Sequence, residues 1–336
     1  MLQYVPKLTI KHPGAITDLQ VSRIEDSILA ASSSAAGGVC LLMMQLPPAP
    51  GATSADLQFV LAPGDGDDDG GSDDGEGGGY LHELPALHDC PAASLDINAV
   101  RQSLLSVAGD GSICVVPLDA LAQLGGDCCF RSASGWSGFS QGRWVDSNSF
   151  ATAGVLGGLQ VWDVRRGPSP VSNSPLAWGH TGCAALDKQQ GAARQMLCLG
   201  VHPSRPNLAA TGASGGCVAL WDLRFASAPL ALAGAPGAAG DVWELRFDPC
   251  EPLMSSSVAA VPPLLYCTSD GALACAAAAA RPGGAGGGTG GLTAQVLLKD
   301  SCSVNSFDVE PSGGQDIVAV TDAECMLLLS RRAVDS

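Results

Sequence analysis

One structural unit recurs along most of the chain, and this repetition limits the possible folds more than any other feature. Each copy has an alternating apolar segment, a second apolar segment that ends in small residues, a tight turn and a third apolar segment. The copies lie at 16–42, 93–118, 142–165, 199–224, 242–249 with 264–275, and 304–329. Short segments of β-branched or small residues bounded by Gly or Pro are typical of β-strands. No segment shows sustained helical periodicity.

A two-residue turn separates the second and third segments of every copy. These turns fall at Gly37-Gly38, Asp110-Gly111, Gly157-Gly158, Gly215-Gly216, Asp270-Gly271 and Ala323-Glu324. Asp-Gly and Gly-Gly pairs supply the positive φ that two-residue hairpins require. Four-stranded blades of ~40–45 residues with insertions between them would give this spacing. The sequence therefore predicts an all-β propeller with six blades visible, as a single domain over residues 1–336.

Two stretches interrupt the repeats, at about 47–79 and about 276–291. The first is rich in Gly, Asp and Pro, and the second in Ala and Gly. Such compositions bury too little apolar surface to order themselves. Both stretches are predicted to be disordered inserts.

The formal charge of −16 is unevenly distributed, and the first insert carries a dense run of acidic residues. Seven acidic residues lie there close together: Asp65, Asp67, Asp68, Asp69, Asp73, Asp74 and Glu76. Basic residues never cluster beyond doublets such as Arg165-Arg166. A nucleic-acid-binding face needs a coherent basic patch to displace phosphate counterions. Direct binding of DNA or RNA is therefore not expected.

The 13 cysteines include no C-x-x-C pair, and the five histidines do not group with them. Zinc sites need close ligand pairs, and disulfide scaffolds are short and dense in cysteine. Reduced, mostly buried thiols in a nuclear or cytosolic protein are the expected state. The first residues lack the apolar core of a signal peptide, and no run approaches the ~18 apolar residues of a membrane span.

Three pattern matches resemble chemical sites but lack the context that such sites need. Residues 212–216 fit the G-x-S-x-G nucleophile elbow, but they form a hairpin turn, and no His follows His202. Residues 65–76 fit an EF-hand loop without flanking helices. Residues 286–291 fit G-x-G-x-x-G without a strand–turn–helix context. No catalytic, cofactor-binding or metal site is predicted, and the chain is not expected to be an enzyme.

Two Trp-Asp dipeptides, Trp162-Asp163 and Trp221-Asp222, end the third segments of their copies, as in WD repeats. In that family the Trp packs between blades, while a His, a strand Ser or Thr and a turn Asp share buried hydrogen bonds. Gly215 stands where the turn Asp of its copy would be, so that network is expected to be incomplete. The residues predicted to have this structural role are Trp162, Asp163, His180, Thr211, Trp221, Asp222, Asp110 and Asp270.

The ordered series of motifs resembles one WD-repeat family, the small β-propeller nucleoporin of the Y-shaped outer-ring scaffold of the nuclear pore. The resemblance is carried by HPGAITDLQV, LQVWDVRR, VHPSRPNLAATG with ALWDLR, VWELRFDP, and VNSFDV with VTDAECMLLLSRR. It implies a structural, non-enzymatic subunit that docks on an α-solenoid nucleoporin of the short arm. It further implies a place at the nuclear envelope, without membrane insertion or a small-molecule substrate, and a link to transport of mRNA and protein.

One departure from that family concerns the number of blades. Its members are seven-bladed, and this chain aligns with blades two to seven, with only residues 2–10 ahead of Ile16. Three explanations stay open: an incomplete N-terminus, a ring closed with six blades, or an open ring to which a partner donates a blade.

Other functions are compatible with a propeller, because fold does not imply function. The W-D-x-R ends at Arg165 and Arg224 resemble the box of substrate receptors of cullin-type ubiquitin ligases. A propeller enzyme would need convergent acid, base or metal ligands, and the sequence has no such set. Trp243 and Phe247 are expected in the core between blades. No partner-binding residue can be named from the sequence.

Overall fold

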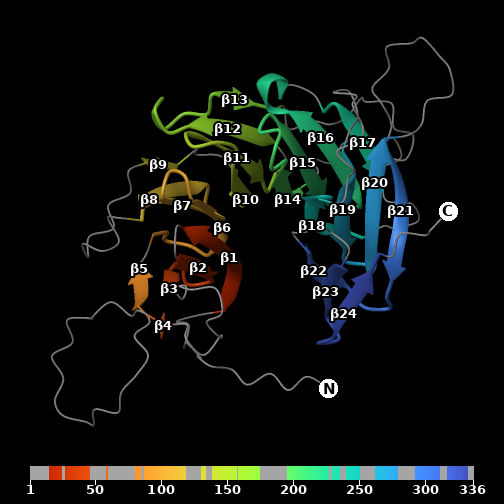
Figure 1. The fold of residues 1–336 in the computed structure, drawn as a ribbon. Helices are drawn as coiled ribbons and strands as arrows, with labels where there is room; N and C mark the ends of the chain where they lie inside the picture. Colours follow the sequence, from red (N-terminus) through yellow and green to blue (C-terminus); the bar gives the residue numbers. More distant parts are fainter. Residues whose placement is uncertain are drawn as a thin grey trace, which may run out of the picture. The chain divides into compact units, whose positions relative to one another are not determined.

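Among the residues that the structure describes, the regular elements are β-strands and one turn of 3-10 helix at Leu223–Phe225 (Figure 1). The computed structural model describes residues 15–24, 27–45, 58–59, 80–84, 87–118, 130–133, 138–156, 158–174, 195–226, 229–234, 240–249, 262–278, 292–310 and 316–331. It divides into two compact units, residues 1–136 and 137–336.

The described residues of the first unit form two antiparallel sheets. The first sheet consists of β1 (Ile16–Ile24), β2 (Ser27–Ser34) and β3 (Val39–Gln45), with β4 (Gln58–Phe59) and β5 (Tyr80–Leu84) both paired with β3. The second sheet follows the order β6 (Ala92–Asn98), β7 (Ser103–Ala108), β8 (Ser112–Pro117) and β9 (Phe130–Ala133). The second sheet is a meander, because its successive strands pair in chain order, and the first sheet follows the same pattern from β1 to β3.

The second unit holds four antiparallel sheets of the same kind. The first two are β10 (Phe139–Trp144), β11 (Ser149–Gly154), β12 (Leu159–Asp163) and β13 (Ser172–Asn173), and then β14 (Met196–Val201), β15 (Leu208–Ala213), β16 (Cys217–Asp222) and β17 (Ala231–Gly234). The third is β18 (Val242–Phe247), β19 (Leu264–Thr268), β20 (Ala272–Ala278) and β21 (Leu292–Lys299). The fourth is β22 (Val304–Val309), β23 (Asp316–Thr321) and β24 (Met326–Ser330). In the described residues the last sheet has three strands. The predicted repeats therefore correspond to six sheets.

The predicted two-residue turns join the second and third strands of their sheets, apart from Gly157, which lies outside the described residues. Gly37 and Gly271 have φ of 83° and 88°, in the left-handed region that favours glycine. Neither has room for a side chain, because a Cβ at Gly37 would meet the carbonyl oxygen of His88, and one at Gly271 that of Asp300. In the last sheet the same conformation falls on Glu324, with φ of 57°.

The first strand of each described sheet carries a β-bulge after its first residue. A bulge redirects the side chains that follow it. The residue after the bulge is Asp18 in β1, Ser94 in β6, Gln141 in β10, Cys198 in β14, Glu244 in β18 and Ser306 in β22. These six positions are therefore structurally equivalent.

Apolar cores lie between successive sheets within each unit. One core joins β14–β17 to β18–β21 and includes Leu220, Leu245 and Tyr266 together with Ala210 and Ala274. Small residues thus fill part of this core. Phe247 is buried in this core as expected, but Trp243 is 43% exposed, so the expectation for Trp243 is wrong. The bulge places Trp243 outside the alternation that buries Val242 and Leu245.

The predicted inserts lie mostly outside the described residues, but Gln58–Phe59, within the first insert, form β4 and pair with β3. Ala276–Ala278, at the predicted start of the second insert, instead continue β20, where they pair with residues of β21. The assignment of residues 1–336 to a single domain stays a prediction.

Candidate interaction surfaces

The two Trp side chains of the Trp-Asp dipeptides are buried and bonded in the same way. Nε1 of Trp162 donates to Oγ1 of Thr152 at 3.0 Å, and Nε1 of Trp221 donates to Oγ1 of Thr211 at 2.8 Å. In each pair the Thr lies on the second strand of the sheet and the Trp on the third. Phe150 stacks on Trp162 with ring centroids 6.0 Å apart. These contacts fix the third strand against the second inside the sheet.

The aspartates of the same dipeptides hold the arginines two residues later. Asp163 accepts from Nε of Arg165 at 2.9 Å and from its Nη2 at 2.7 Å, and Asp222 binds Arg224 in the same way at 2.9 and 2.6 Å. Hydrogen bonds from Arg165 hold the pKa of Asp163 at about 2. Both arginine side chains are mostly exposed, yet Nε and Nη2 of each guanidinium are bound by the aspartate of the same repeat. This geometry agrees with a local structural role for the arginines.

The turn aspartates cap their own hairpins. Oδ1 of Asp110 accepts from the backbone N–H of Ser112 at 2.9 Å. Burial alone would raise the pKa of Asp110, but hydrogen bonds from Ser112 outweigh burial and lower it. Asp270 accepts from Oγ1 of Thr268 at 2.5 Å and from Nζ of Lys299 at 2.9 Å. Each carboxylate thus stays in its ionised form at a tight turn.

The turn that lacks an aspartate at Gly215 receives one from another segment. Its backbone N–H donates to Oδ1 of Asp241 at 2.9 Å, and Asp241 precedes the first strand of the next sheet. The backbone N–H of Asp241 in turn donates to Oγ of Ser269 at 2.8 Å. The missing carboxylate is therefore replaced from the neighbouring sheet.

A buried histidine that the sequence reasoning did not single out completes one network. Nδ1 of His88 lies 2.6 Å from Oγ of Ser112, and its Nε2 lies 2.7 Å from Oγ of Ser106. His88 precedes β6, and the two serines lie on β7 and β8 of the same sheet. Leu87 precedes His88 in place of the Gly of a Gly-His pair, so the usual signal is absent. The predicted His180 lies outside the described residues.

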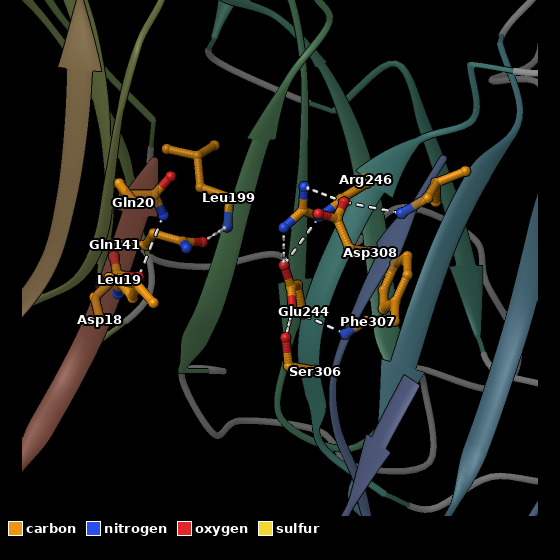
Figure 2. Close-up of polar contacts among 11 residues, drawn as sticks. Asp18, Leu19, Gln20, Gln141, Leu199, Glu244, Arg246, Ser306, Phe307 and Asp308 are labelled. Atoms are coloured by element: carbon orange, nitrogen blue, oxygen red, sulfur yellow. Dashed lines mark hydrogen bonds and ion pairs between the residues drawn. The ribbon is translucent and has the colours of Figure 1, made fainter. Parts of the chain in front are cut away.

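Three of the residues after the bulges, Asp18, Gln141 and Glu244, connect their sheet to the next through an acceptor oxygen (Figure 2). Oδ2 of Asp18 accepts from the backbone N–H of Leu95 at 2.9 Å. Figure 2 shows the same relation where Gln141 meets the backbone N–H of Leu199 and where Glu244 meets that of Phe307. Glu244 also binds Arg246, which forms an ion pair with Asp308 at 2.9 Å. Sequence patterns gave no sign of these contacts, because their partners lie 58 to 77 residues apart.

The described part of the chain contains no group of three or more His, Cys, Asp or Glu side chains that could hold a metal ion. Ser214 of the G-x-S-x-G match lies in the hairpin between β15 and β16, as expected. The EF-hand-like and G-x-G-x-x-G matches lie outside the described residues. None of the described helical residues forms a segment long and apolar enough to span a membrane.

Several large apolar side chains are exposed instead of buried. On the first sheet they are Ile16, Leu19 and Val21, and on the last sheet Val320, Met326 and Leu328. Others, Val171, Phe225 and Leu230, lie after the third strands of the two sheets β10–β13 and β14–β17. Exposed apolar groups that gather on one face mark surfaces for other proteins.

Comparison with known proteins identifies a relative among the nucleoporins. No protein-family model matches the chain. Over 204 residues the chain is 27% identical to the Arabidopsis thaliana protein "Nuclear pore complex protein NUP43", across 56% of this chain and 48% of that protein. The chain thus spans about half the length of this curated relative. The predicted resemblance to the small WD-repeat nucleoporins is confirmed.

Solved structures of WD40 propellers share the fold. The β-propeller domain of Cps50 (Swd1) from Myceliophteria thermophila matches with a TM-score of 0.63 at 15% identity, over 97% of this chain and 85% of that one. Sqt1 from Chaetomium thermophilum matches with a TM-score of 0.62 at 16% identity, over 94% of this chain and 69% of that one. The predicted fold class, an all-β WD40 β-propeller with six blades visible in this chain, is confirmed.

Proposed function

We propose that the chain is a non-enzymatic structural subunit of the nuclear pore complex scaffold. The observation that carries this proposal is the 27% identity over 204 residues to a plant nuclear pore complex protein. The propeller fold supports a protein-binding role, because propellers offer several faces for binding other proteins. The exposed apolar side chains of Val171, Phe225 and Leu230 supply surface for such contacts.

The proposed partners are other nucleoporins of the outer-ring Y complex, in particular the α-solenoid subunit of the short arm. The proposed location is the nuclear pore complex at the nuclear envelope, and the proposed role is support of nucleocytoplasmic transport of mRNA and protein. The net charge of −16 supports a protein partner over a nucleic acid, since phosphate contacts need clustered Lys and Arg. No small-molecule substrate, cofactor or membrane insertion forms part of this function.

Tagging the chain in its own cells tests the proposal. Affinity purification followed by mass spectrometry is expected to recover solenoid and propeller nucleoporins, and a fluorescent tag is expected to mark the nuclear rim. An unrelated WD40 propeller with the same tag serves as the background control. Recovery of a cullin and its adaptor without nucleoporins would overturn the proposal.

A double variant separates the two outcomes further. Arg165→Ala with Arg224→Ala removes the arginines that a ligase adaptor would contact. Because both arginines bind their own aspartates, the scaffold function predicts unchanged recovery of nucleoporins from this variant. A ligase receptor would instead lose its adaptor.

A further inference from the structure

The first sheet exposes a face that is covered at the equivalent place in other sheets. By the bulge register, Leu19 of β1 corresponds to Leu95 of β6, Leu199 of β14 and Phe307 of β22. The exposed fractions of Leu95, Leu199 and Phe307 are 0, 2 and 2%, because the preceding sheet packs on them. Leu19 is 58% exposed and Val21, two residues later, is 61% exposed. We call this side of β1–β3 the receiving face.

The receiving face extends onto the second strand. Val21 pairs with Ala30 and Arg23 pairs with Ile28, so Ile28 and Ala30 lie on the same side of the sheet as Leu19 and Val21. The opposite side packs against β6–β8 through Leu29, Ala31 and Leu41. Thus one side of the sheet packs against the next sheet of its unit. The other side presents an apolar surface of the kind that a preceding sheet covers elsewhere in the chain.

The last sheet exposes the opposite kind of face. Met326 and Leu328 of β24 correspond by register to Val218 and Leu220 of β16. The exposed fractions of Val218 and Leu220 are 0 and 1%, because they pack on the sheet that follows. Those of Met326 and Leu328 are 74 and 68%. Val320 and Val318 lie beside them on the same side, which we call the covering face.

The polar side chains of the last sheet are bonded to the preceding sheet. Ser306 occupies the position of Asp18, Gln141 and Glu244, whose oxygens accept from a backbone N–H of the next sheet, but the hydroxyl of Ser306 donates to Glu244. Asp308 likewise forms its ion pair with Arg246, so the covering face is defined by its apolar side chains. On the receiving face, the backbone N–H equivalent to those of Leu95 and Phe307 is that of Leu19. In the single chain this N–H is bonded to the carboxylate of Asp18, one residue earlier.

We propose that the receiving face of one copy of this chain binds the covering face of a second copy. The same kind of junction already joins successive sheets within the chain. Each of the two faces therefore has the shape and the apolar side chains that pack against the other. The contact joins two different surfaces and is therefore heterologous, which leads to head-to-tail assembly. It is mainly apolar, so added salt weakens it little.

Two double variants of the purified full chain test this contact. Leu19→Asp with Val21→Asp disables the receiving face, and Met326→Asp with Leu328→Asp disables the covering face. Wild type is expected to rise above its single-chain mass of 33.8 kDa with concentration in sedimentation velocity, and each variant is expected to stay at that mass. An equimolar mixture of the variants is expected to form a pair of chains and nothing larger, because only one intact junction is left.

The control variant is Val100→Asp, in the exposed turn between β6 and β7, which leaves both faces intact. It is expected to associate like wild type, and circular dichroism checks that all variants are folded. Wild type that keeps its single-chain mass at every concentration would overturn the proposal, since the faces are then satisfied otherwise. Association that survives in both variants, or a mixture that stays dissociated, would overturn it as well. Purified protein alone suffices, so this result is independent of the nuclear pore experiment.

Discussion

The backbone N–H of Phe307 donates to a carboxylate oxygen of Glu244, 3.2 Å away, and joins β22 to β18. Asp18 and Gln141 make the same contact with the sheets that follow them. An acid at one position and an amide at another indicate that the acceptor oxygen is required and the charge is not. Blade-to-blade attachment in this chain therefore includes a directional polar contact beside the apolar cores.

Substitutions at Glu244 distinguish the contribution of its acceptor oxygen to stability from that of its negative charge. Glu244→Gln keeps an oxygen for Phe307 and loses the ion pair with the half-exposed Arg246, so it should cost about 1 kcal/mol or less. Glu244→Leu removes the acceptor and should cost about 1–3 kcal/mol. Urea unfolding measures both free energies. Equal losses in the two variants would contradict the role of the acceptor.

Thr211 provides a second test of a buried hydrogen bond. Thr211→Val keeps the shape of the side chain but removes the acceptor for Nε1 of Trp221, so unfolding free energy should fall by about 1–3 kcal/mol. Thr211→Ser retains the hydroxyl and serves as the control, with a clearly smaller loss. Trp fluorescence during urea unfolding follows both. If Ser destabilised the chain as much as Val, packing of the methyl group would be the main effect.

A largely buried ion pair ties the end of the last sheet to β18. Nη1 and Nη2 of Arg331 lie 2.5 and 3.0 Å from the carboxylate oxygens of Asp248. Removing one partner of such a pair costs about 3–5 kcal/mol, whereas replacing both with apolar groups costs much less. Arg331→Met should therefore destabilise the chain strongly, and adding Asp248→Leu should recover part of the loss. Thermal unfolding of the two single variants and the double variant gives the coupling; additive losses would argue against it.

Acid stability should depend on Asp163. Hydrogen bonds from Arg165 lower its pKa from an ordinary value near 3.8 to about 2 in the folded chain. The unfolded chain therefore takes up a proton at higher pH than the folded chain, and the stabilisation is present above about pH 4 and lost towards pH 2. Asp163→Asn should lower the melting temperature near neutral pH and approach wild type near pH 2. A constant difference across this range would contradict the assignment.

The sequence was sufficient to predict the sheets and their turns, because Gly, Asp-Gly and Trp-Asp signals act within one hairpin. It was insufficient for contacts that form across sheets. Asp241 replaces the aspartate missing at Gly215, and no local pattern marks such a substitute. Trp243 was expected in the core, but a bulge, which the alternation of residues does not reveal, leaves it exposed. The exposed faces of the terminal sheets likewise depend on which sheets have a neighbour.

The small side chains between the sheets have a consequence for which sequence changes the chain can tolerate. A Cβ at Gly212 would meet the side chains of Val242 and Cys198, and one at Gly200 would meet Leu245. Neighbouring positions such as Ala210 and Ala274 are already fully enclosed. Replacing such an alanine with glycine removes only one methyl group, whereas a larger side chain at these positions forces two sheets apart. Sequence changes in this protein should therefore be tolerated mainly at its surfaces and in its connecting segments. Substitution of the interior alanines and glycines by larger residues should be tolerated poorly.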